Sequence, residues 1–164
     1  MIKKLEKAVQ LLTKHFPPDD ENSRKPVLPH DIRVAAYLSE NDYSDEVVLA
    51  GLLHDAIEWS DLTEQILRDA FGDKVVKLVL ACTKDDSIKD SDEKIEELIK
   101  RCARNGQDAL IVKTADILDS YEHYTKTNNK DELEYCRKNA GAILEYKPEN
   151  FDDPIFNKLK KLYE

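Results

Sequence analysis

Cysteine, glycine and proline are scarce in this chain of 164 residues, which contains 3, 4 and 6 of them, respectively. The three cysteines are odd in number, far apart and in no Cys-x-x-Cys pair. They argue against a disulfide framework and a zinc knuckle, and we expect them to serve as small hydrophobic residues in a reducing compartment. With so few Gly and Pro residues, long stretches lack turn signals, which favours helices.

Long apolar runs and an excess of positive charge are also absent. The longest clean apolar run, 47–53, is far shorter than the ~18 residues of a membrane span, and the first residues lack the apolar core of a secretion signal. With 34 acidic and 25 basic residues, the net charge is −9. We therefore expect a cytoplasmic protein that binds neither membranes nor nucleic acid. An anionic small substrate would need a local cationic pocket or a bound metal.

Apolar residues recur at helical spacing in most of the chain, which predicts an all-α fold. Residues 17–28 are expected to form a loop, and Pro29 to open a helix that carries His30 in its first turn. Segment 47–59 is apolar on nearly every face, so it is predicted to be a buried central helix. A capping-box spacing at Asp61 predicts the start of another helix. The length favours one domain over 1–164, with further helices at 75–80, 92–104, 107–124, 130–146 and 154–163.

The predicted central helix contains three ionisable residues, His54, Asp55 and Glu58. Buried ionisable groups need partners. His54 and Glu58 share a helix face, and Asp55 lies about 100° round from His54, so the adjacent imidazole and carboxylate can converge on one ion. Such mixed nitrogen and oxygen ligation suits Mn, Fe or Zn. A His–Asp pair that satisfies itself by a hydrogen bond in a helical core is the alternative for this dipeptide alone.

Two further ionisable residues amid apolar neighbours extend the pattern: His30 lies 24 residues before His54, and Asp116 lies 61 residues after Asp55. This pattern resembles the HD superfamily of metal-dependent phosphohydrolases, an all-α fold. Over roughly residues 20–125 the chain is similar to the hydrolase domain of RelA/SpoT homologues and to the small alarmone hydrolases. The similar segments, in order, are 24–30, 50–58, 71–79, 82–84 and 112–116.

The resemblance implies that His30, His54, Asp55 and Asp116 bind one divalent metal ion. Mn²⁺ is the expected ion, and Fe, Zn, Ni, Co and Mg are the alternatives. The metal would lower the pKa of a bound water toward neutrality and polarise a phosphoryl oxygen. We therefore expect an HD-type helical bundle around a buried metal-binding helix.

The acidic pair that follows in this family, held to orient and deprotonate the attacking water, is only half present. Glu58 is retained and Trp59 replaces the second acid, so Glu58 works alone, Asp61 substitutes, or the chemistry differs. Ser120 stands where the family tends to have Asn. Trp59 is either a core or rim aromatic or a ring on which a base or sugar stacks.

The resemblance also implies a nucleotide substrate, with ppGpp and removal of its 3′-pyrophosphate as the leading reaction, in a monomer or homodimer. Arg24, Lys25 and Lys113 are the expected phosphate-binding cations, together with Trp59 and Ser120 in the substrate site. The alternatives are a catalytically weak HD-fold module that binds or senses a nucleotide, and a helical interaction domain with no site. The remaining charged candidates are expected at the surface or satisfied, although His123 lies on a helical spacing near Asp116; they are Arg33, Lys84, Arg104, His15 and His123.

Overall fold

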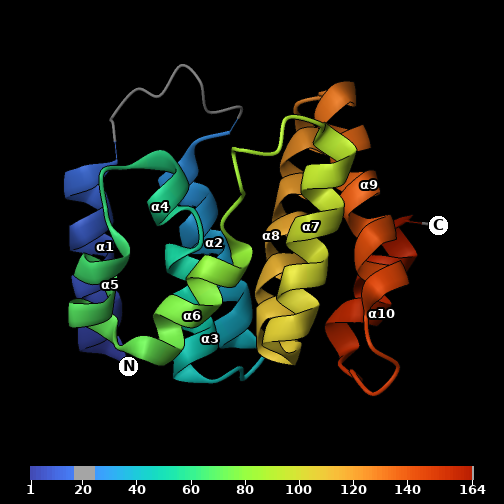
Figure 1. Ribbon diagram of the computed structural model, residues 1–164. Helices are drawn as coiled ribbons and strands as arrows, with labels where there is room; N and C mark the ends of the chain where they lie inside the picture. The colour runs from blue at the N-terminus through green and yellow to red at the C-terminus, as the bar shows by residue number, and fades with distance from the viewer. Residues whose placement is uncertain (17–24, 164) are drawn as a thin grey trace.

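The computed structural model describes residues 1–16 and 25–163, and within these ranges every regular element is a helix (Figure 1). The predicted all-α fold is therefore confirmed. The expectation of Arg24 as a substrate residue lies outside the described residues. The helices are α1 (Ile2–His15), α2 (Val27–Glu40), α3 (Asp45–Leu53), α4 (Ala56–Trp59), α5 (Glu64–Phe71), α6 (Asp73–Cys82), α7 (Ser91–Asn105), α8 (Gln107–Lys126), α9 (Lys130–Tyr146) and α10 (Pro154–Tyr163).

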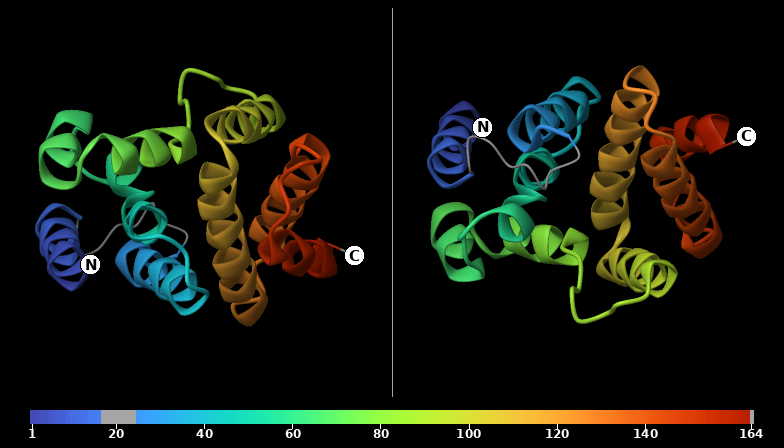
Figure 2. Two further views of the ribbon diagram at one scale, coloured as in Figure 1. Left: turned by 90° about the horizontal axis from the view of Figure 1, so that it is seen from below. Right: turned by 90° about the horizontal axis from the view of Figure 1, so that it is seen from above.

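Helix α8 is the centre of the arrangement, because it lies between two groups of helices. It packs against α2, α3 and α6 on one side and against α9 and α10 on the other, with α7 alongside, as both views in Figure 2 show. Because α8 is covered on both sides, it buries several of its polar residues, namely Lys113, Thr114, Asp116 and Ser120.

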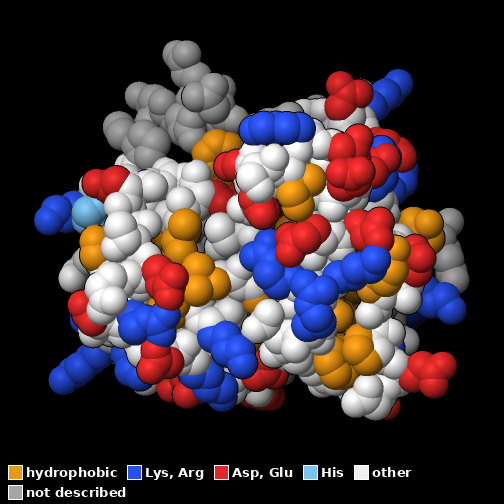
Figure 3. All heavy atoms as spheres, viewed as in Figure 1, with side chains coloured by type: hydrophobic (Ala, Val, Ile, Leu, Met, Phe, Trp, Pro, Cys, Tyr) orange, Lys and Arg blue, Asp and Glu red, His pale blue; other side chains and the backbone are white. Residues whose placement is uncertain are grey.

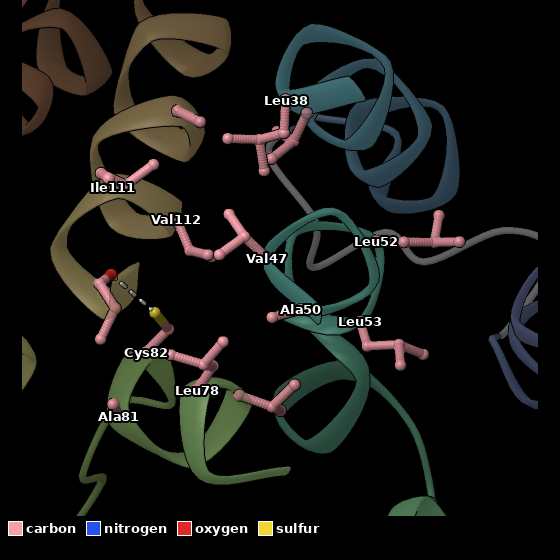
Figure 4. Packing of buried hydrophobic residues seen from close by; sticks show 14 of the residues in the cluster. Leu38, Val47, Ala50, Leu52, Leu53, Leu78, Ala81, Cys82, Ile111 and Val112 are labelled. Carbon is pink, nitrogen blue, oxygen red and sulfur yellow. Dashed lines mark hydrogen bonds between the residues drawn. The ribbon is translucent and has the colours of Figure 1, made fainter. Parts of the chain in front are cut away.

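Helix α3 forms the core beside α8, and its residues 47–53 are all buried, as predicted for the central apolar segment. Figure 4 shows Val47 of this helix close to Val112 of α8, with Leu38 of α2 and Leu78 of α6 nearby. The Ser44 hydroxyl caps the first turn by accepting a hydrogen bond from the Val47 amide. This packing fixes the position of the C-terminal end of α3, and His54 and Asp55 follow directly after it.

The predicted continuous helix over 47–59 is wrong at one point, because α3 ends at Leu53 and α4 begins at Ala56. The His54 Nδ1–H donates to the Gly51 carbonyl oxygen at 2.8 Å. That carbonyl is the acceptor that the Asp55 amide would use in an uninterrupted α-helix, so the side chain competes with the backbone there. The His–Asp pair therefore lies at a break between two helices, although the backbone of both residues stays in the right-handed helical region.

Two predicted helix starts are also displaced. Helix α2 begins at Val27, two residues before Pro29, which occupies a first-turn position whose amide needs no intrahelical partner. The cap of α5 is Thr63, whose hydroxyl accepts a hydrogen bond from the Ile66 amide, and not Asp61. Both shifts are small and leave His30 in the first turn of α2, as expected.

Basic and acidic side chains are interspersed over the face in Figure 3, with hydrophobic side chains between them. Across residues 1–16 and 25–163, none of the helices combines the length and the apolar character that a bilayer crossing requires. The three cysteines, Cys82, Cys102 and Cys136, are free and buried, as expected for small hydrophobic residues.

Gly51 is the position at which α2 and α3 approach most tightly. A Cβ atom there would overlap Leu38 Cδ1 and lie 3.3 Å from Val34 Cγ1, and both neighbours are fully buried. We expect Gly51→Ala to lower the free energy of unfolding by about 1–3 kcal/mol through overpacking, partly offset by about 1 kcal/mol of helix propensity. Urea unfolding followed by circular dichroism measures this change.

The matched control is Gly141→Ala in α9. The atoms nearest to a Cβ there would be the hydroxyl oxygen and two ring carbons of Tyr163, at 3.2–3.4 Å, and that side chain is half exposed. Gly141→Ala should therefore be neutral or slightly stabilising. Equal stability losses in the two variants would contradict the close approach at Gly51.

Candidate metal centre

Four side chains from three separate parts of the chain meet in the interior. The His30 Nε2 of α2 lies 3.3 Å from the His54 Nε2 and 3.1 Å from the Asp116 Oδ1 of α8. His54 Nε2 lies 3.5 Å from the Asp55 Oδ1 and 3.7 Å from the same Asp116 oxygen. All four residues are buried. The structure thus brings together the four residues that the sequence singles out as candidate ligands.

The second nitrogen of each imidazole is already committed. His30 Nδ1 lies 2.6 Å from the Asp119 Oδ2, and Arg33 holds that carboxylate through two hydrogen bonds of 2.8 and 2.9 Å. His54 Nδ1 faces the Gly51 carbonyl oxygen. Because a carboxylate and a carbonyl only accept, both rings carry a proton on Nδ1, and their Nε2 atoms face the same space. Two neutral Nε2 lone pairs that converge in this way require a cation or a proton between them.

The ammonium of Lys25 meets part of this requirement. Its Nζ lies 2.8 Å from His30 Nε2, 3.3 Å from Asp116 Oδ1 and 2.5 Å from the Ser120 Oγ. Ser120 in turn donates to Asp116 Oδ1 at 3.1 Å. Lys25 and Ser120, which were expected to bind substrate, therefore contact the candidate metal ligands themselves.

Neighbouring charges shift the pKa values of the residues in this centre. Burial opposes the charged form of His54, but the carboxylates of Asp55 and Asp31 outweigh it and raise the pKa of this imidazole to about 10. Burial likewise opposes the Asp116 carboxylate, yet Lys113 and Lys25 hold its pKa well below the usual range. Lys113 Nζ donates to Asp116 Oδ2 at 2.8 Å. Surroundings that favour a proton on His54 also favour a divalent cation.

Asp31 provides an independent test of whether a metal ion fits. Its carboxylate is fully buried, and neither oxygen accepts a hydrogen bond from any residue that the structure describes. Burial raises the pKa of Asp31 well above its usual range. One donor atom each of His30, Asp31, His54 and Asp55 lies within 4.8 Å of the other three. The donor set of imidazoles and carboxylates, with an orphaned carboxylate beside it, fits a divalent ion.

A cavity of about 370 Å³ opens onto this centre. Such a volume lies within the usual range of small-ligand sites, about 300–1,000 Å³. Asp55, Asp116 and Trp59 line its wall, together with the aromatic residue Tyr135. Although the whole chain is acidic, this cavity concentrates cations in its lining, namely Lys25, Lys84, Lys89, Lys94 and Lys113.

Glu58 lines the same cavity and is held by Lys84. Its Oε1 accepts a hydrogen bond from the Lys84 backbone amide at 2.7 Å, and its Oε2 accepts one from Lys84 Nζ at 3.0 Å. Burial opposes the Lys84 ammonium, but the Glu58 carboxylate outweighs it and raises the pKa of Lys84. Lys84 was expected at the surface or satisfied, and its side chain is partly exposed and paired with Glu58 while it also lines the cavity.

Some of the charged residues considered in the sequence analysis do not line the cavity. Asp61 is largely exposed and pairs with His15 at 2.6 Å, and it does not line the cavity. Arg104 is exposed, and Arg33 lies behind His30 through Asp119. His123 contacts the ring of Tyr124.

Two residues with a place in the site, Asp31 and Asp119, were not singled out as site residues by sequence reasoning, and Lys84 was considered there only as a weaker candidate. Asp31 forms a second His–Asp dipeptide with His30, which is a signal as strong as that of His54–Asp55 taken alone. Asp119 lies one turn after Asp116, which is a weaker signal. Lys84 lies in a charged connection, and nothing in its neighbours distinguishes it from a solvated lysine.

A family model described as HD domain matches residues 8–139. The chain therefore belongs to the HD domain family.

Curated relatives from several bacteria are similar to parts of the chain. A guanosine-3′,5′-bis(diphosphate) 3′-pyrophosphohydrolase of Aquifex aeolicus is 34% identical over 105 residues, which cover 61% of this chain and 15% of the relative. A probable enzyme of the same name from Mycoplasma pneumoniae is 32% identical over 142 residues, with 76% and 19% covered. A GTP pyrophosphokinase of Streptomyces coelicolor is 29% identical over 148 residues, with 88% and 17% covered. The chain thus spans less than a fifth of each of these relatives.

Two solved structures share the fold. One is a metazoan orthologue of SpoT, described as hydrolysing ppGpp, with a TM-score of 0.78 and 21% identity over 98% of this chain and 93% of that chain. The other is a protein of Listeria monocytogenes, with a TM-score of 0.69 and 24% identity over 82% of this chain and 90% of that chain. At these identities the likeness establishes the HD-type helical fold, as expected from the sequence.

Metal binding is directly testable. We expect the chain to bind one divalent ion, and His54→Ala and Asp55→Ala to lose it, because each variant removes a donor from the space that the imidazoles share. Elemental analysis after soaking in Mn²⁺ gives the stoichiometry. Since the ion would bind only the folded state, EDTA should also lower the melting temperature of the parent.

His123→Ala is the matched control, since this imidazole contacts the ring of Tyr124 and does not line the cavity, so its loss should leave the stoichiometry unchanged. The assignment fails if the parent holds no stoichiometric metal, or if His54→Ala binds it as tightly as the parent does.

Proposed function

We propose that the protein is a metal-dependent phosphohydrolase that cleaves a phosphate or pyrophosphate ester of a nucleotide. The observation that carries this proposal is that candidate metal donors and a group of lysines line one cavity. An acidic protein attracts a phosphate ester only where the local charge is reversed, and this cavity is such a place. The names of the relatives from Aquifex aeolicus and Mycoplasma pneumoniae support ppGpp as the substrate and its 3′-pyrophosphate as the leaving group.

The residues that would hold the ion are His30, His54, Asp55 and Asp116, and Mn²⁺ is the ion we propose. When bound, a divalent ion supplies Lewis-acid polarisation of the phosphoryl group and makes water more acidic. Asp119 and the Gly51 carbonyl keep the two imidazoles in the tautomer that presents Nε2. Lys113 fixes the orientation of Asp116 through its second oxygen.

Glu58 is the residue we assign to the attacking water. Each of its oxygens accepts one hydrogen bond from Lys84 and retains a further lone pair, so the carboxylate can still orient a water molecule or take its proton. Lys84 fixes the position of this carboxylate on the cavity wall. Asp61 has no part in this assignment, because it is exposed and paired with His15.

Lys25 has two roles open to it, because its ammonium lies among the metal donors. The Lys25 Nζ lies 2.8 Å from His30 Nε2 and 3.3 Å from Asp116 Oδ1, so a divalent ion bound to these atoms would repel the ammonium and move the Lys25 side chain away. The side chain is already part of the cavity lining, where a substrate phosphate would be its next partner. This exchange supports the assignment of Lys25 as a substrate-binding residue.

A nucleotide-binding module without turnover is the second candidate function. The observation that favours it is that Lys84 donates a hydrogen bond to each oxygen of Glu58, which leaves this carboxylate fewer lone pairs to receive a proton from water. Assays for phosphate and pyrophosphate release on ppGpp and a panel of nucleoside phosphates, with added Mn²⁺, separate the two functions. Release from any of these supports the hydrolase, and nucleotide binding without release supports the module.

Glu58→Gln should abolish turnover while metal remains bound, because the amide retains the shape but cannot take a proton. Loss of a positioned acid or base typically costs about 10²–10⁴-fold in rate. Steady-state kinetics and metal analysis of the same preparation test both halves. Retention of more than about a tenth of the parental rate would remove Glu58 from the mechanism.

The matched control is Lys84→Met, which removes the ammonium and leaves the carboxylate. We expect a smaller loss of rate than in Glu58→Gln. Equal losses would show that Glu58 acts only by holding Lys84.

Trp59 lines the cavity beside Glu58, where its ring can stack on a base or sugar. We expect Trp59→Ala to weaken substrate binding by about 1–3 kcal/mol, the range for base–aromatic stacking, and Trp59→Phe to retain much of the affinity. KM values, together with direct nucleotide binding, measure the loss. If both variants bind nucleotide like the parent, Trp59 is only part of the cavity wall.

A further inference from the structure

Asp31 is the buried group that the proposed mechanism does not use. It adjoins His30 in α2, its side chain is inaccessible to solvent, and both of its oxygens lack a hydrogen-bond partner among the described residues. Burying a carboxylate that accepts no hydrogen bond is costly, and the nearest positive group, the His54 imidazole, lies 3.6 Å from the Asp31 Oδ1. Such a carboxylate is stabilised by a proton or by a cation close to its oxygens.

Asp31 is not needed to orient His54. The distance from Asp31 Oδ1 to His54 Nδ1 is 3.6 Å, which is too long for a hydrogen bond. The single proton on that nitrogen is already donated to the Gly51 carbonyl at 2.8 Å. In many metal sites a carboxylate accepts a hydrogen bond from the ring nitrogen of histidine that does not bind the metal. At His54 a backbone carbonyl takes this role, so the oxygens of Asp31 remain available.

The position of Asp31 relative to the other donors suits a shared ion. One of its oxygens lies within 4.8 Å of a donor atom of His30, His54 and Asp55. Like charges on Asp31 and Asp55 at this separation repel each other unless a cation lies near both. Ligands of one small divalent ion, each bound at about 2.0–2.2 Å, are separated by similar or slightly shorter distances, so a small movement of the carboxylate suffices.

We propose that Asp31 is a fifth protein donor to the metal centre, so that the centre combines two imidazoles with three carboxylates. The inference rests on the proposed metal site and adds a residue to it. A third carboxylate has a chemical consequence, because oxygen donors favour Mn²⁺ and Mg²⁺, whereas imidazoles suit Zn²⁺. Asp31 thus selects the ion as well as strengthening its binding.

The experiment compares the full-length parent with Asp31→Asn and with the exposed control Asp152→Asn. Each protein is stripped with a chelator and titrated calorimetrically with MnCl₂ and with ZnCl₂. We expect Asp31→Asn to bind Mn²⁺ about 10- to 100-fold more weakly, a range typical of damage to a metal site, with a distinctly smaller loss for Zn²⁺. The control should match the parent for both ions.

Melting temperatures provide a readout that does not depend on activity. In EDTA, Asp31→Asn should melt at or above the temperature of the parent, because the substitution removes a buried charge that has no partner. In Mn²⁺ the order should reverse, because the parent gains more from the ion. If Asp31→Asn fails to fold, Asp31→Ala removes the same charge without leaving an amide to satisfy and carries the same expectation.

Two results would overturn the inference alone: parental affinity for both ions in Asp31→Asn, or equal losses for both ions together with a lower melting temperature in EDTA. The second result is what a merely structural residue would give. A parent that binds neither ion would overturn the proposed function as well, so the two failures are distinguishable.

Discussion

Two imidazole nitrogens that face each other across 3.3 Å of buried space place a requirement on everything around them. Because their other nitrogens are committed to acceptors, the shared space must hold positive charge. The Lys25 ammonium enters it, Lys113 neutralises Asp116 from the far side, and Arg33 stabilises the Asp119 that holds His30. These three cations therefore all stabilise one small cluster of metal-donor side chains.

The cluster also accounts for the contrast between the charge of the whole chain and that of its cavity. A net charge of −9 makes the exterior repel phosphates, whereas the wall of the cavity is rich in lysine. Several of these lysines form ion pairs with individual carboxylates: Lys84 pairs with Glu58, and Lys113 pairs with Asp116. A cation in the shared space would release part of this lysine charge toward a ligand, which links metal binding to anion binding within one cavity.

Much of this arrangement follows from the sequence, because helical periodicity and buried polar residues leave clear patterns. The all-α fold and the buried segment 47–53 follow from these patterns, whereas the meeting of His30, His54, Asp55 and Asp116 was implied by the resemblance to the HD superfamily. The break at His54 was not predictable, since it depends on a hydrogen bond from a side chain to the Gly51 carbonyl. Lys84 and Asp61 show a second limit: whether a charged residue in a connection faces a cavity or solvent depends on tertiary packing, which the local sequence does not specify.

The separation of the donors along the chain has a consequence for folding. His30 and Asp116 are 86 residues apart, and the donors lie close in sequence only as two adjacent pairs, His30 with Asp31 and His54 with Asp55. Closing so long a loop costs entropy before any contact compensates for it, so the complete donor set forms only after α2, α3 and α8 have packed together. An unfolded or partly folded chain presents an ion with two neighbouring donors at most. Metal binding would then follow the packing of the helices. Because the ion would bind only the folded chain, it would also slow unfolding of the helical bundle.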